Sequence, residues 1–461
     1  MTLFRRLDRR ILALALPAAG SALVPVIHRM VDMAWIRELG TEAVAALGVA
    51  TISVWLFVAI GWAFAMGLTA LVGRYVGARR PDASGYVASQ GLRWGTAIGV
   101  LCIGIGWFLA PVVFRLAGTE AAVHALGVSY TRIYWAGGAF VLVQFAGDAI
   151  CRGHGDTRTP LKIGLASLAL NAVIDPLFIR GIDPILPAMG VAGAALATVI
   201  ASVFAAVLYL YVLRQRGYLH AQRPPDESLR FEGTTRLGQP GLFGLDGAIF
   251  RRVARVGTPT FITSMLFDLI LLEMMRVAEH AGGPAAQAGL TIGHTGEGFA
   301  FVMGLGWSAA AASLVGRRMG AGQIHAAERA AWRAAIQCGA LNLLFAVLMF
   351  GFADELAWLW AKEPAAHAHA ASYYRIVAWC LVPQAIEIVI DGAFGGAGMT
   401  VPPMVVGVSL SAARIPLAWW AVFDLGLGVD GIWIVVAATA SLRGLLIGYW
   451  FSRGTWKTRS V

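Results

Sequence analysis

The chain alternates long apolar runs with short polar segments along its whole length. Each run holds about twenty residues or more, the length that an α-helix needs to cross roughly 30 Å of hydrocarbon. The pattern predicts an all-α membrane protein with twelve transmembrane helices. The predicted spans are 11–36, 47–72, 92–116, 128–151, 160–181, 189–214, 256–279, 290–316, 333–354, 372–395, 403–424 and 428–452.

The two halves of the chain carry the same motifs in the same register. The stretch 71–78 (LVGRYVGA) returns 243 residues later as 314–321 (LVGRRMGA), and Asp148 returns as Asp391. This repeat predicts two pseudo-symmetric six-helix bundles. Two homologous membrane halves are the usual architecture of a secondary transporter, which binds its substrate near the bilayer midplane.

One polar segment longer than a loop separates the two halves. It contains Arg-Pro-Pro-Asp and several glycines without an apolar period, which is typical of a connector. We therefore expect an N-terminal six-helix bundle over 1–214, a cytoplasmic connector over 215–255 and a C-terminal six-helix bundle over 256–461.

Composition agrees with a membrane protein: 58% of the residues are hydrophobic and 13% are charged. The net charge of +10 does not indicate nucleic acid, because the basic residues gather in alternate loops. They precede the first span, follow the second and eighth, flank the connector and end the chain. This positive-inside bias predicts a multi-pass protein of the inner (plasma) membrane with both termini in the cytoplasm.

The chain lacks the signatures of an enzyme. Its four cysteines all fall in predicted spans and have no metal-ligand spacing, so a disulfide framework or a zinc site is not expected. Neither a clustered nucleophile nor a His-Glu-x-x-His motif is present. We expect no cofactor.

Ionisable residues inside the first half point to a cation site. Asp32 lies in span 1 and Asp175 in span 5, where a charge costs about 2.5–3.5 kcal/mol on insertion scales. Asn171 precedes Asp175 by four residues, and His28 has the same relation to Asp32, so each pair shares a helical face. Together with a hydroxyl such as Thr198 they predict an oxygen-rich pocket. It suits H⁺ or Na⁺, and the alternative is a structural hydrogen-bonded network.

Two prolines, Pro17 and Pro25, interrupt span 1 and make it a candidate for a bending helix. The second half has acids of its own in Asp268, Glu273 and Glu297. We expect Glu273 to pair with Arg276 along the helix, whereas Asp268 and Glu297 suit a functional or a structural role equally. Arg414, which the repeat aligns with Asn171, is expected to neutralise an acid there.

Several segments, in this order and spacing, resemble the MATE (multidrug and toxic compound extrusion) family of the MOP superfamily, and its DinF-like branch in particular. The resemblance covers essentially the whole chain. The segments that carry it are 30–33 (MVDM), 67–73 (GLTALVG), 152–160 (RGHGDTRTP), 171–176 (NAVIDP) and 190–198 (GVAGAALAT).

The resemblance implies a secondary active antiporter that exports organic, cationic or aromatic compounds in exchange for H⁺ or Na⁺ by alternating access. Asp32, Asn171 and Asp175 fall on the positions that carry the coupling ion in this branch, and Thr198 matches its span 6 hydroxyl. Asp268 approximately matches the span 7 acid of other branches, whereas Gln384 stands at the place of their span 10 acid.

The expected partners are small organic substrates and the lipid bilayer, and one chain that supplies both halves is expected to work as a monomer. The nearest alternative function is a lipid-linked oligosaccharide flippase, which would need a cavity rich in arginine. A membrane-embedded enzyme and a passive channel are further alternatives. The sequence leaves open the natural substrate, the coupling ion, the role of the C-terminal acids and the resting conformation.

Overall fold

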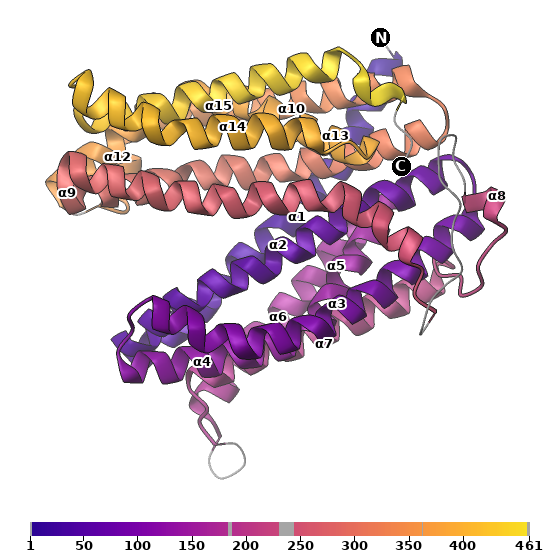
Figure 1. Cartoon of the computed structure of the whole chain (residues 1–461), viewed down its shortest axis with the longest axis horizontal. Coiled ribbons are helices and arrows are strands. Elements are labelled where there is room, and N and C mark those ends of the chain that lie inside the picture. The colour runs from indigo at the N-terminus through magenta and orange to yellow at the C-terminus, as the bar shows by residue number, and fades with distance from the viewer. Residues whose placement is uncertain (1, 183–186, 230–243, 362, 459–461) are drawn as a thin grey trace. The chain divides into compact units, whose positions relative to one another are not determined.

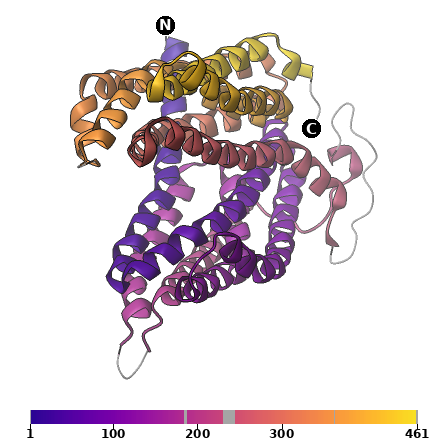
Figure 2. The same ribbon diagram turned by 60° about the vertical axis from the view of Figure 1, so that its left-hand side comes forward.

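The computed structural model describes residues 2–182, 187–229, 244–361 and 363–458, and these are mostly α-helical (Figure 1, Figure 2). The helices of the first half are α1 (Thr2–Ile36), α2 (Thr41–Gly77), α3 (Pro81–Leu116), α4 (Ala121–Ala136), α5 (Gly138–Gly153), α6 (Arg158–Arg180), α7 (Val191–Gln215) and the short α8 (Asp226–Leu229).

The second half repeats this arrangement of long helices. Its elements are α9 (Gly247–Gly320), α10 (Ile324–Gly351), α11 (Ala353–Trp358), α12 (Pro364–Val377), α13 (Leu381–Ala397), α14 (Val401–Trp419), a π-helical turn (Trp420–Asp424) and α15 (Gly428–Ser452).

The predicted spans all coincide with helices of the described chain. Among the described residues, ten helices are long and apolar enough to cross a membrane, and α4 with α5, bent by 51°, passes the same test as a pair. Helix α9 contains two predicted spans, because its backbone leaves helical geometry at Gly282 and at Gly283, where φ is 65°. Only glycine adopts such a φ without strain, so this dipeptide separates the two spans. The all-α, multi-pass prediction is confirmed.

The described chain forms two compact units. Residues 20–258 make up one, here called the N-unit, and residues 1–19 with 259–459 make up the other, the C-unit. The predicted division at 1–214, 215–255 and 256–461 follows the repeat along the chain, whereas the units follow contacts. Helix α1 therefore contributes its first half to the C-unit and its second half to the N-unit.

Small residues bring neighbouring helices into backbone contact, as expected where dispersion must replace the hydrophobic effect. A Cβ added to Gly193 of α7 would lie 2.4 Å from the carbonyl oxygen of Phe178 in α6. In the C-unit, a Cβ on Gly444 of α15 would lie 2.1 Å from the carbonyl oxygen of Pro383 in α13. Both contacts leave no room for any side chain.

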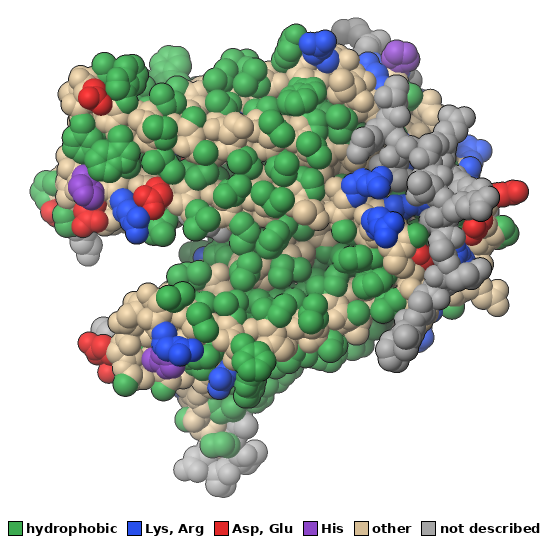
Figure 3. Space-filling model, in the orientation of Figure 1, with side chains coloured by type: hydrophobic (Ala, Val, Ile, Leu, Met, Phe, Trp, Pro, Cys, Tyr) green, Lys and Arg blue, Asp and Glu red, His purple; other side chains and the backbone are tan. Residues whose placement is uncertain are grey.

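Large apolar side chains also cover the outside of the helices, and charged ones gather near the helix ends (Figure 3). Leu101 and Phe108 of α3 are 65% and 76% exposed, and Leu445 of α15 is 61% exposed. An apolar surface of this extent is stable against lipid rather than water.

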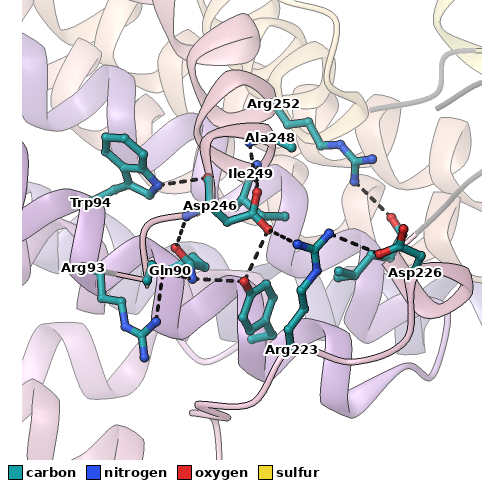
Figure 4. Close-up of polar contacts among 12 residues, drawn as sticks. Gln90, Arg93, Trp94, Arg223, Asp226, Asp246, Ala248, Ile249 and Arg252 are labelled. Carbon is teal, nitrogen blue, oxygen red and sulfur yellow. Dashed lines mark hydrogen bonds and ion pairs between the residues drawn. The ribbon is translucent and has the colours of Figure 1, made fainter. Parts of the chain in front are cut away.

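The end of the connector is fixed on α3 by Asp246, whose side chain is buried (Figure 4). Its carboxylate accepts hydrogen bonds from the backbone N–H of Ala248 (2.9 Å) and from the Tyr86 hydroxyl (3.3 Å). The Gln90 amide spans the Asp246 N–H and the Gly244 carbonyl, at 2.9 and 2.8 Å. The connector thus enters α9 capped and anchored, while its residues 230–243 lie outside the described chain.

Candidate functional site

The two acids predicted in spans 1 and 5 meet inside the N-unit. Helices α1 and α6 run parallel and close together: a Cβ on Gly20 would lie 3.0 Å from Leu161, and one on Gly164 would lie 3.4 Å from Val24. This register brings Asp32 of α1 against Asp175 of α6. Both side chains are buried, with 6% and 0% of their surface exposed.

The carboxyl groups of Asp32 and Asp175 interact electrostatically with each other. Two neighbouring carboxylates repel each other when both are charged, and a proton or a small cation between them relieves that repulsion. Asn171 donates from Nδ2 to Oδ1 of Asp175 at 3.1 Å and is itself fully buried. In chemical terms, this arrangement of two carboxyl groups and an amide can accommodate one positive charge, as a proton or as a small cation.

Four polar atoms around this pair have no hydrogen-bond partner within the described chain: His28 Nε2, Asp32 Oδ1, Asn171 Oδ1 and Asp175 Oδ2. The His28 Nε2 to Asp32 Oδ1 distance is 3.8 Å, too long for a hydrogen bond. Buried polar groups are nearly always paired in native proteins. A concentration of unpaired oxygens beside two acids is what a cation ligand would satisfy.

Arg29, which was not predicted as a site residue from the sequence, is exposed on α1 one turn before Asp32. Its guanidinium lies 5.3 Å from the ring centroid of Trp55 and interacts electrostatically with Asp32. Its signal was available in the sequence, because an arginine inside an apolar run is as unusual as an aspartate. It supplies a fixed positive charge beside the acid pair.

Two tyrosines of α4, also missed from the sequence, lie near the acid pair. Tyr130 and Tyr134 are buried and stack with ring centroids 6.4 Å apart, and both interact electrostatically with Asp32 and Arg29. Aromatic residues are common in apolar spans, and only the fold brings this pair to the acids.

Thr198 is buried on α7, where its hydroxyl donates to the Ala194 carbonyl of the same helix at 3.0 Å. The neighbouring α6 is tied to α7 through Ser167, whose hydroxyl donates to the Ala201 carbonyl at 2.9 Å. The hydroxyl of Thr198 bonds within its own helix, and its part in ion binding stays a prediction.

Pro25 does not break α1. The helix continues through Pro17 and Pro25 from Thr2 to Ile36, and the expected bend of span 1 stays a prediction. Proline lacks the backbone N–H but has a φ that suits a helix, which allows a weakened yet continuous turn.

Glu297 of α9 is buried in the C-unit and fully engaged there. It accepts hydrogen bonds from the Tyr373 hydroxyl at 2.6 Å and from the Gln384 amide at 2.5 Å, and His294 Nδ1 lies 3.6 Å from it. Gln384, which replaces the acid expected by the family pattern, thus serves as a donor to Glu297. This carboxylate has its partners inside the protein.

Two buried arginines balance the acids of the C-unit. Arg414 of α14 donates from Nε to the Thr439 hydroxyl at 2.7 Å and interacts electrostatically with Glu297 and Glu387. Arg443 of α15, which the sequence analysis missed, lies 3.2 Å from Glu387. The C-unit therefore contains a network of fixed charges where the N-unit contains a carboxyl pair.

The remaining acids lie elsewhere. Glu273 and Arg276 form an exposed helical ion pair at 2.7 Å, as the spacing predicted. The side chain of Asp268 lies outside the described residues. Among the described residues, no three His, Cys, Asp or Glu side chains come together as a set of metal ligands.

Comparison with known proteins relates this architecture to one family. The family model MatE matches residues 17–177 and 259–420. The probable multidrug resistance protein NorM of Thermotoga maritima is 26% identical over 461 residues, covering 98% of this chain and 94% of that protein. The probable multidrug resistance protein YoeA of Bacillus subtilis is 23% identical and covers 92% and 89%. A solved MATE transporter of Vibrio cholerae is 20% identical, with a TM-score of 0.86 and full coverage of both chains.

Proposed function

The chain belongs to the MatE family of membrane transporters, and we propose that it is a secondary active antiporter that exports organic, cationic or aromatic compounds in exchange for H⁺ or Na⁺. Members of this family are transporters and not enzymes, and they need no cofactor. The observation that carries the proposal is the buried pair Asp32–Asp175 with its unpaired oxygens.

Charge balance supports one monovalent cation per site. Arg29 contributes one positive charge beside the two carboxyl groups, so a single H⁺ or Na⁺ makes the site neutral. In a medium of low dielectric constant a neutral site is strongly favoured over a charged one. Uptake of the ion therefore changes the net charge of the N-unit by one.

That change in charge is the proposed link to transport. An ion that binds one conformation better than another shifts the population between them, by no more than the difference in its binding free energies. We infer that ion entry between Asp32 and Asp175 bends α1 near Pro25, where a backbone hydrogen bond is missing. The bend lowers the affinity for a bound organic cation, which leaves on the outer side.

The substrate class rests on two kinds of support. The Thermotoga maritima and Bacillus subtilis relatives are both named probable multidrug resistance proteins. In this chain, Trp55 and Trp62 of α2 are about 40% exposed and pack edge to face at 6.0 Å. Partly exposed indoles offer stacking and cation–π contacts to flat organic cations.

The proposal also covers the location, orientation and oligomeric state of the protein. We expect it in the inner membrane with both termini in the cytoplasm, as the distribution of basic residues predicts. We expect a functional monomer, because one chain supplies both repeats. The DinF-like branch is the family branch that fits the acids of the N-unit.

The test is ethidium efflux from energised everted vesicles, driven in turn by an imposed pH gradient and by an imposed Na⁺ gradient. Asp32→Asn and Asp175→Asn each remove one carboxylate, so we expect gradient-driven efflux to fall at least tenfold in both. Glu273→Gln is the matched control, since it removes an exposed carboxylate from another span. It is expected to transport like the wild type.

Full gradient-driven efflux by Asp32→Asn at normal expression would contradict the mechanism. If the wild type uses neither gradient, ethidium is not a substrate, and labelled lipid-linked oligosaccharide becomes the next substrate to test. The alternative flippase function is not favoured by the names of the relatives or by the acidic character of the N-unit site.

A further inference from the structure

A cavity of about 410 Å³ opens at the start of α10 in the C-unit. Its lining residues all belong to the first turns of α10 and are mainly basic and aromatic: His325, Glu328, Arg329, Trp332 and Arg333. None of them takes part in the ion site of the N-unit. The cavity therefore needs an explanation of its own.

The surroundings of the cavity carry positive charge that the protein does not balance. Arg318 of α9 is repelled electrostatically by Arg10 of α1 and by Arg329. No described carboxylate forms an ion pair with any of these three guanidinium groups. The two acids nearby are already engaged, since Glu328 lies 2.8 Å from Lys457 and Asp8 lies 3.8 Å from Arg333.

Arg318 is held at the start of α10, the helix that lines the cavity, by a specific contact. Its guanidinium donates to the carbonyl oxygen of Ala326, next to the lining residue His325. In the internal repeat, Arg318 corresponds to Tyr75 of the first half, so the second copy of the motif has gained a charge. A cluster of like charges that is fixed in place is stabilised by an anion.

The helix that carries the cavity continues as an apolar surface. Ile336, Leu343 and Val347 follow Arg329 and Trp332 along one face of α10 at helical spacing, and they are 60%, 55% and 63% exposed. Trp332 lies at the junction, with its ring edge to face against Phe451 at 6.1 Å. Tryptophan is enriched at the boundary between headgroups and hydrocarbon.

We propose that this cavity binds the phosphate headgroup of an anionic phospholipid, with its acyl chains along the exposed apolar face of α10. Basic residues attract anionic lipid because each contributes favourable energy close to the membrane surface. The lining residues belong to the N-terminal turns of α10, where the helix dipole also favours an anion. The exposed apolar face of α10 favours a lipid over a free phosphate, because a free phosphate has no acyl chain to lie along it.

The experiment is native mass spectrometry of the purified full-length chain, titrated with phosphatidylglycerol or with phosphatidylcholine of the same acyl chains. Arg318→Gln and Arg329→Gln are each expected to weaken phosphatidylglycerol binding about fivefold, and the double variant more than tenfold. Arg158→Gln is the control, because it removes an exposed arginine from the start of α6 in the N-unit. It is expected to leave binding unchanged.

A second arm uses glycerol 3-phosphate and inorganic phosphate as soluble competitors, and neither is expected to displace the lipid at millimolar concentration. Because Arg329→Gln removes the repulsion between Arg329 and Arg318, this lipid-free variant is expected to melt at or above the wild-type temperature, whereas Arg318→Gln also loses the contact with Ala326. A loss of phosphatidylglycerol binding without a lower melting temperature is then due to loss of the binding site and not to unfolding.

Equal binding of the two lipids, or an equal loss in Arg158→Gln, would overturn the proposal. Displacement by inorganic phosphate would also overturn it, and would assign the cavity to a soluble anion. The proposed lipid site does not depend on the proposed transport function. A failed lipid titration leaves the ion site at Asp32 and Asp175 intact, and an absence of ethidium efflux leaves the lipid site intact.

Discussion

At the residue scale, the strength of the ion site depends on how firmly its oxygens are held. Asn171 is the only side chain that donates an amide hydrogen bond to the acid pair among the described residues, and it is fully buried. A hydrogen bond to a charged group contributes about 1.5–3 kcal/mol. Asn171 thus fixes Asp175 in the orientation that faces Asp32.

We expect Asn171→Ala to raise the half-saturating concentration of the coupling ion at least tenfold while ethidium binding changes little, because one oxygen and the orienting amide are lost. The measurement is efflux rate against pH or Na⁺ concentration. Asn342→Ala is the control, since Asn342 is a buried amide of the C-unit that donates to Cys338 of its own helix. An unchanged ion dependence in Asn171→Ala would remove this residue from the site.

A second residue-scale prediction concerns pH and Asp156, in the loop before α6. Burial alone would raise its pKa, but hydrogen bonds from Thr159 and the guanidinium of Arg216 hold the pKa of Asp156 below its ordinary value. A carboxylate with a lowered pKa stabilises the fold above its ordinary pKa, and this contribution is lost as the pH falls through the lowered value.

Asp156→Ala should therefore lower the melting temperature at pH 7, with a loss of about 1 kcal/mol for the helix-start contacts. The difference from the wild type should shrink as the pH falls toward 3 and the wild-type carboxylate takes up a proton. Melting curves of both proteins in detergent, from pH 7 to pH 3, give the answer. A difference that grows on acidification would contradict the assignment.

At the element scale, the acid pair exists because glycines let helices approach closely. Gly193 places α7 against the Phe178 carbonyl of α6, the helix that carries Asp175. Gly20 and Gly164 likewise lie where α1 and α6 contact each other, next to the side chains of Leu161 and Val24. Because the contact of Gly193 involves backbone atoms, the spacing of α6 and α7 is rigid there.

We expect Gly193→Ala to force α6 and α7 apart, with a loss of about 1–3 kcal/mol and a weaker affinity for the coupling ion. Gly104→Ala is the matched control, because a Cβ there meets nothing within 4 Å. In a helix interior, alanine is favoured over glycine by about 0.5–1 kcal/mol, so this variant should be as stable as the wild type or more so. Thermal unfolding in detergent compares them, and equal melting temperatures would show that the helices adjust freely.

At the scale of the whole molecule, two halves with one repeat pattern carry different chemistry. The N-unit holds a carboxyl pair with unpaired oxygens, whereas the C-unit holds Glu297 and Glu387 against Arg414 and Arg443. The two buried arginines are part of the chain, so Glu297 and Glu387 already have positive counter-charges within the C-unit. We infer that the exchangeable ion is confined to the N-unit.

Glu297→Gln should accordingly destabilise the protein by about 3 kcal/mol, because Arg414 loses a buried counter-charge, and leave the ion dependence of efflux unchanged. Asp32→Asn should show the reverse pattern. Glu273→Gln breaks only an exposed pair, worth about 0–1 kcal/mol, and serves as the stability control. A shifted ion dependence in Glu297→Gln would place a second coupling site in the C-unit.

Much of this protein follows from local sequence pattern. The length of the apolar runs determined the helices, because lipid leaves the backbone no other way to satisfy its hydrogen bonds in a single segment. Because a charge in hydrocarbon costs free energy, Asp32, Asp175 and Glu297 could be identified from the sequence as unusual residues. The same reasoning applied to Arg29 would have found it. Helical spacing predicted the pairs Asn171–Asp175 and Glu273–Arg276.

Only the tertiary structure decided which of these groups meet. The sequence could not tell that Asp32 faces Asp175 while Glu297 is surrounded by Tyr373, Gln384 and His294, because these contacts join helices far apart in the chain. It marked Pro25 as a place where span 1 bends, and the helix continues through this residue. Spacing along one helix is set by covalent geometry, whereas pairing between helices is set by packing, and that physical difference separates what the sequence determined from what the fold decided.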